Sequence, residues 1–166
     1  SILSLTRVVE PLLARSPSLK EAHLHRQLAI AYAYSRAGEI AEFQGRIRRL
    51  RTGQYKGRIE PLRMEAFGLI EMVRVEGLES TTQINYLSKA VEALERFSKD
   101  PSLSDPAERA TVLNNAAVVL LRLGLLMKAP NLKSRALKQI QEALKLEPGD
   151  ALLKKNLAAV EARVKK

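Results

Sequence analysis

The sequence contains no cysteine and no tryptophan, and aromatic residues make up only 4% of it. Without cysteine the chain can form no disulfide, no zinc–thiolate site and no catalytic thiol. The only histidines are His23 and His25, whose i, i+2 spacing places them on different sides of a helix, where they cannot share a metal ion. No phosphate-binding glycine loop is present. We therefore expect no metal, no cofactor and no enzymatic activity.

Hydrophobic residues make up 46% of the 166 residues, enough for one domain with a sizeable core, which we expect to span 1–166. The chain begins without Met and opens inside an apolar-periodic stretch, which favours a fragment of a longer protein. The longest apolar stretch, 116–127, contains Arg122 and is shorter than a membrane span. No secretory signal is visible. A soluble intracellular domain without a transmembrane segment is expected.

Apolar residues recur at helical spacing throughout the chain, and no period-two strand pattern is present. Eight helices are expected, at about 2–15, 20–36, 39–51, 61–76, 80–98, 106–127, 131–146 and 150–165. Asp105 and Asp150 are good N-cap residues for two of them. The helices fall into pairs, because Gly38, Gly77 and Gly124 follow the first helix of each. Gly124 either ends its helix or lies inside a longer one.

Small and apolar residues at fixed spacing mark the segment ALKQIQEALKLEP, which carries Ala136, Ile140, Ala143 and Pro148. This segment resembles the second helix of the tetratricopeptide repeat (TPR) family. The three glycines lie 39 and 47 residues apart, whereas the family repeat is about 34 residues. The resemblance implies an all-α, TPR-like α-solenoid of about three irregular helix pairs, with 150–165 as a capping helix.

The first helices of TPR pairs line a concave groove, so the resemblance implies a scaffold that binds a segment of a partner protein there. The expected groove residues are Tyr32, Arg36, Phe67, Arg74, Asn114, Asn115 and Arg122. The three arginines recur at nearly the same place in the three first helices. Their guanidinium groups suit an acidic peptide. The alternative is that they complement the helix dipoles and stay solvated.

The two asparagines are open to two interpretations. They can hydrogen-bond a bound peptide backbone, or they can make a contact on the helix surface or between repeats. Asn115 matches the groove asparagine of TPR domains that clamp the C-terminal carboxylate of heat-shock chaperones. Those domains also use a Lys and an Arg where this chain has Leu152 and Asn156, so the clamp is incomplete.

The net charge of the chain is +10, and two segments, 45–63 and 131–166, hold all of the positive excess. Residues 45–63 contain seven basic side chains and one Glu. The expected anion-binding patch consists of Arg46, Arg48, Arg49, Arg51, Lys56 and Arg58. With Tyr55 as a stacking group, it favours RNA or ribonucleoprotein association as the alternative function. Charge runs of this kind are usually a solvated loop or a contact with an acidic partner. Self-association through neighbouring repeats is a further possibility.

Overall fold

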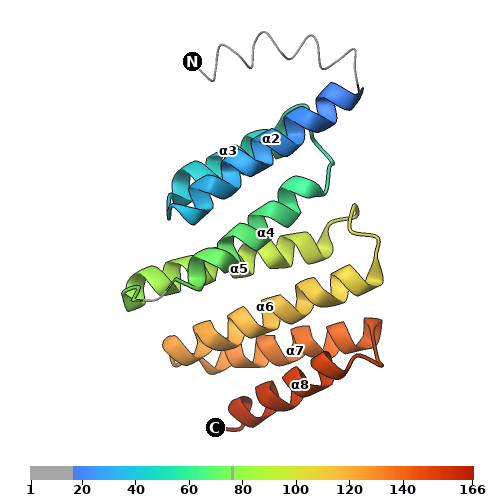
Figure 1. Ribbon diagram of the computed structural model, residues 1–166. Helices are drawn as coiled ribbons and strands as arrows, with labels where there is room; N and C mark the ends of the chain where they lie inside the picture. Colours follow the sequence, from blue (N-terminus) through green and yellow to red (C-terminus); the bar gives the residue numbers. More distant parts are fainter. Residues whose placement is uncertain (1–16, 76) are drawn as a thin grey trace. The chain divides into compact units, whose positions relative to one another are not determined.

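The computed structural model describes residues 17–75 and 77–166, and these residues form α-helices and no β-strand (Figure 1). The helices are α2 (Pro17–Arg36), α3 (Ile40–Thr52), α4 (Glu60–Val73), α5 (Ser80–Lys99), α6 (Pro106–Leu126), α7 (Pro130–Leu146) and α8 (Ala151–Val164). The prediction of an all-α protein is confirmed, and each described helix lies within three residues of its expected bounds. The helix expected at 2–15 lies outside the described residues. The structure divides into two compact units between Lys56 and Gly57, and the described part of the first unit is 17–56.

Aspartate caps begin two of the helices as expected. The Asp105 side chain accepts a hydrogen bond from the backbone N–H of Ala107 at 3.0 Å, and Asp150 does the same for Leu153 at 3.0 Å. Each carboxylate satisfies a backbone donor that has no partner within its helix, which fixes where α6 and α8 start.

The three glycines expected to follow the first helices differ in their structural role. Gly38 and Gly77 both have a φ of +77°, a left-handed conformation that helix-ending turns use and that glycine adopts without strain. Gly124 instead lies inside α6, which continues to Leu126, so the longer-helix alternative holds. A Cβ at Gly124 would lie 3.2 Å from the backbone nitrogen of Lys133. This glycine therefore permits the close approach of α6 to α7 and does not end the helix.

In the first unit, α2 and α3 pack against each other as a helical hairpin. The buried apolar side chains are Leu24, Leu28, Ala31, Phe43, Ile47 and Leu50. They recur every three or four residues on each helix, so one apolar stripe of α2 meets one of α3.

Tyr55, after the end of α3, closes this small core. It is only 1% exposed, and its hydroxyl donates to the backbone carbonyl of Lys20 at 3.0 Å. The same hydroxyl lies 2.5 Å from Nδ1 of His23, and the two rings stack with centroids 5.8 Å apart. These contacts join the segment after α3 to the first half of α2.

In the second unit, α4 and α5 form one hairpin and α6 and α7 the next, and α5 packs on α6 (Figure 1). Two contacts show that α4 and α6 run parallel. Near their starts, Arg63 pairs with Glu108 at 2.6 Å. Near their ends, the Arg122 guanidinium donates to the carbonyl of Val73 at 3.2 Å. The two first helices are therefore side by side in the same direction.

The second helices follow the same order. Arg135 of α7 pairs with Glu95 of α5 at 2.5 Å, and the ends of α5 and α7 border one pocket. The last helix, α8, packs on α7 and also contacts α6. Within this unit, α4, α6 and α8 thus form one layer, and α5 and α7 form the other. Ala136, Ile140 and Ala143 are fully buried in α7, as their spacing suggested.

Candidate functional site

One stripe of α4 borders α6 and stays partly open. Arg63, Phe67 and Arg74 share this stripe because they are spaced by four and seven residues. Arg63 reaches Glu108 of α6, which shows where the stripe points. Phe67 remains 49% exposed, and Arg74 donates to the carboxylate of Glu71 at 3.0 Å. A large apolar side chain is therefore held at the surface beside a cation.

A matching stripe runs along α6. Glu108 and Arg122 both reach α4, and Asn115 lies on the same stripe between them. Val118, next to this stripe, is 48% exposed. Because α4 and α6 run parallel, one side of each helix, next to the contact between them, faces the same common surface. Phe67 and Val118 are consequently turned toward the same open surface.

The last helix borders α6 on the other side of Val118. Its Asn156 side-chain Nδ2 donates to Oδ1 of Asn114 at 2.8 Å. Leu152, one turn earlier on α8, is 58% exposed, and Lys155 is exposed as well. We call the surface shared by these three helices the parallel-helix face. It consists of Phe67, Glu71, Arg74, Asn115, Val118, Arg122, Leu152 and Lys155.

The two adjacent asparagines differ in environment. Asn114 is buried, and its hydrogen bond with Asn156 connects α6 to α8, its neighbour in the same layer. Asn115 is half-buried and makes no side-chain hydrogen bond to another described residue. The side-chain amide of Asn115 can therefore hydrogen-bond a ligand at the parallel-helix face.

The expected groove residues belong to two units. Phe67, Arg74, Asn114, Asn115 and Arg122 all lie in the second unit, on α4, after its last residue, or on α6. Tyr32 and Arg36 lie on α2 in the first unit, where Tyr32 is half-buried and Arg36 is exposed. The structure thus brings together the residues contributed by the second and third helix pairs.

Arg46 and Arg58, two of the basic residues in 45–63, have partners within the structure. Arg46 lies over the ring of Tyr34, 4.7 Å from its centroid, and 3.8 Å from the Glu42 carboxylate. Arg58 pairs with Glu60 at 2.6 Å, and this hydrogen bond lowers the pKa of Glu60 below its usual value. Part of the positive charge is therefore already balanced by carboxylates.

The remaining members of the expected patch differ in exposure. Arg48, Arg49 and Lys56 are exposed, whereas Arg51 is half-buried. Arg58 belongs to the second unit and the others to the first. Tyr55, the expected stacking group, is buried against His23, so the expectation of an accessible aromatic ring here is wrong. The reason is that its hydroxyl and ring complete the core of the first unit.

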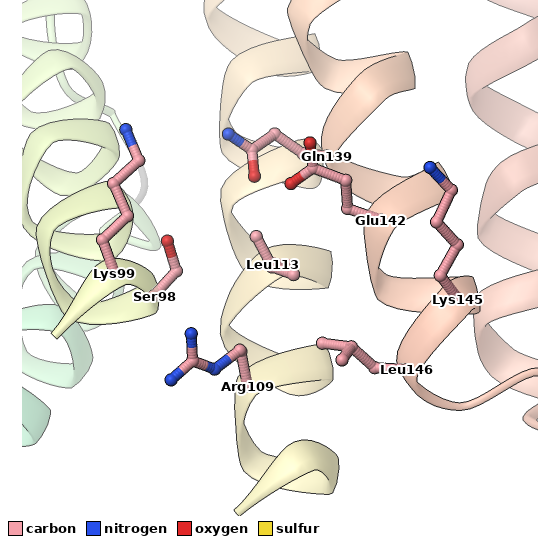
Figure 2. A pocket seen from close by; sticks show the side chains of 8 residues that line it. All are labelled: Ser98, Lys99, Arg109, Leu113, Gln139, Glu142, Lys145 and Leu146. Carbon is pink, nitrogen blue, oxygen red and sulfur yellow. The ribbon is translucent and has the colours of Figure 1, made fainter. Parts of the chain in front are cut away.

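A pocket of about 340 Å³ lies between α5, α6 and α7 in the second unit (Figure 2). The side chains around it are Ser98, Lys99, Arg109, Leu113, Gln139, Glu142, Lys145 and Leu146. Sequence reasoning did not identify this site. The sequence contains only a weak indication of it. Basic residues lie near the ends of two helices and the start of a third, and these positions come together only when the helices pack.

Two further properties bear on function. Among the described residues, no group of three or more His, Cys, Asp or Glu side chains could hold a metal ion. In the same part of the chain, α6 alone is long and apolar enough to cross a membrane. Its most apolar stretch is 56% buried within the structure, and core helices share this length and composition, so it is weak evidence for a span.

Comparison with protein-family models, with curated proteins and with solved structures found no match.

Proposed function

We propose that this protein is a TPR-like helical-repeat module that binds an acidic segment of a partner protein on its parallel-helix face and has no catalytic activity. The order of its helices supports this proposal. Two consecutive hairpins stack with their first helices parallel and their second helices in a separate layer, and α8 occupies the next position in the first layer. Stacked helix pairs of this kind present extended surfaces that bind other proteins.

The observation that carries the proposal is the composition of the parallel-helix face. Phe67, Val118 and Leu152 are each about half exposed on three different helices. Large apolar side chains held at the surface and surrounded by polar groups are typical of sites that bind proteins.

The charges around these apolar residues favour an acidic partner. Arg74, Arg122 and Lys155 are exposed cations, and Glu71 is the carboxylate among them. An amphipathic helix or extended segment with apolar residues flanked by Asp or Glu would complement both properties.

Affinity capture tests the proposal, with the whole chain as bait in nuclease-treated lysate. Val118→Asp should lose the captured partner, because it places a carboxylate among apolar groups and repels an acidic segment. Val118 is already half exposed, so this change should leave the fold intact. Arg74→Gln should weaken the same capture. Ala158→Asp, a change at another exposed position on the far side of α8, is the matched control.

Nucleic-acid association through residues 45–63 predicts the opposite pattern. Capture would then disappear with nuclease and remain unchanged in Val118→Asp, which would overturn the proposal. The ion pair of Arg58 with Glu60 and the burial of Tyr55 weigh against that alternative.

A further inference from the structure

The pocket in Figure 2 is formed where α5 and α7 end and α6 begins. Ser98 and Lys99 come from the end of α5, and Lys145 and Leu146 from the end of α7. Leu113 of α6 lies five residues before Val118, which places it on a different side of that helix. This pocket is therefore separate from the parallel-helix face.

Its charge is unbalanced. Lys99, Arg109 and Lys145 are cations, and Glu142 is the only carboxylate among the lining residues. Lys99 and Lys145 form no ion pair or hydrogen bond with any residue in the described ranges. The Arg109 guanidinium donates to the backbone carbonyl of Leu103, which leaves most of its five N–H groups for other acceptors.

The helix dipoles explain only part of this arrangement. Lys99 and Lys145 near helix C-termini are favourably placed toward the partial negative charge there. Arg109 lies in the first turn of α6, where the dipole disfavours a cation. Its hydrogen bond to the Leu103 carbonyl holds it there instead, and its side chain lines the pocket.

The rest of the lining suits an apolar group. Leu113 is buried and Leu146 is partly exposed, and Figure 2 shows Leu113 among the other lining side chains. A ligand with one aliphatic side chain next to carboxylates would match both the leucines and the cations. A volume of about 340 Å³ accommodates one or two side chains of a peptide.

We infer that this pocket is a second binding site, which takes an acidic residue and an adjacent aliphatic residue of a partner polypeptide. The aliphatic side chain contacts Leu113 and Leu146, and the carboxylate is bound by Arg109 with Lys99 and Lys145. The inference goes beyond the proposed function, because it concerns different residues on another side of α6.

An NMR titration of the whole chain tests the inference. The probe is a peptide of Asp-Leu-Asp flanked by glycines, acetylated and amidated at its ends. Saturable chemical-shift changes should centre on residues 98–99, 109–113 and 139–146. The same peptide with Asn in place of Asp should cause none. Inorganic phosphate is the second probe, and a response to phosphate without a response to the peptide would overturn the inference.

Two variants with opposite expected effects sharpen the test. Lys145→Gln removes a cation without a partner, so the affinity for the acidic peptide should fall about threefold. Glu142→Gln removes the only carboxylate, so the affinity should rise by a similar factor. Lys138→Gln, the same change on α7 outside the pocket, should have no effect.

Equal affinities in all three variants, or no binding of the acidic peptide at millimolar concentration, would refute the inference. Val118→Asp should leave this titration unchanged. Failure of the parallel-helix face and failure of this pocket are therefore distinguishable.

Discussion

Arg63 of α4 and Glu108 of α6 form a two-point ion pair across 45 residues of sequence. The Arg63 Nε lies 2.6 Å from one carboxylate oxygen, and Nη2 lies 3.0 Å from the other. The hydrogen bond to Glu108 raises the pKa of Arg63 above its already high value. The pair fixes the start of α6 beside the start of α4, and so contributes to the parallel order of the first-layer helices.

Replacing Glu108 by Gln should lower the free energy of unfolding by about 0.5 kcal/mol, because the pair is partly exposed and solvent screens it. Urea unfolding at low and high salt measures this difference, which should shrink as salt rises. Glu92→Gln, an exposed change on α5 without an ion pair in the described residues, is the control. Equal stabilities of the two variants would contradict the prediction.

Gly124→Ala should destabilise the second unit by about 1 kcal/mol, because the added Cβ would lie 3.2 Å from the Lys133 backbone nitrogen and must push α7 away. Gly45, inside α3, has open space around its missing Cβ. Gly45→Ala should therefore stabilise the protein by about 0.5–1 kcal/mol through helix propensity. Thermal unfolding distinguishes the two changes. Stabilisation by both would show that α6 and α7 have room to separate.

Tyr55→Phe should cost about 1 kcal/mol, because it removes the donor to the Lys20 carbonyl and the neighbour of His23 Nδ1 while keeping the ring. Hydrogen exchange of the α2 amides measures the local loss of stability. Tyr86→Phe, on α5 without a hydrogen bond from its hydroxyl in the described residues, is the matched control. Unchanged exchange in α2 would mean that the hydroxyl does not stabilise the hairpin.

The Arg58–Glu60 pair predicts a pH dependence. The hydrogen bond from Arg58 holds the pKa of Glu60 in the folded protein below the ordinary value of 4.5. The ionised Glu60 therefore contributes its full stabilisation of the folded state above that pH. This stabilisation is lost as the pH falls through the pKa that Glu60 has in the folded protein. Arg58→Gln should flatten this part of the stability profile, which denaturant unfolding at several acidic pH values would reveal. Arg49→Gln serves as control, and an unaltered profile in Arg58→Gln would refute the link.

Local features of the sequence predicted the helices well, because their causes are local. Asp105 and Asp150 cap neighbouring backbone donors, and Gly38 and Gly77 supply turns with positive φ. Gly124 allowed two interpretations, since its role depends on α7, which packs against it. A glycine that permits close packing and one that ends a helix are difficult to distinguish from sequence alone.

The candidate site was less predictable, because it depends on contacts between distant residues. Nothing local indicates that Tyr55 is buried, because its partners His23 and Lys20 lie more than 30 residues earlier in the sequence. Asn114 and Asn115 are adjacent and chemically identical, yet only Asn114 lies where α8 reaches it. The pocket between α5, α6 and α7 likewise depends on how two hairpins stack.

The ion pairs in both layers of the second unit have a mechanical consequence. Arg63–Glu108 links the first layer and Arg135–Glu95 links the second, so neither side can hinge open without losing a pair. A ligand bound beside Phe67 and Val118 would therefore meet two helices, α4 and α6, that are already linked before it binds. The entropy lost on association would then come mainly from the ligand. Restricting the ligand to its bound conformation should lower its dissociation rate more than it raises its association rate.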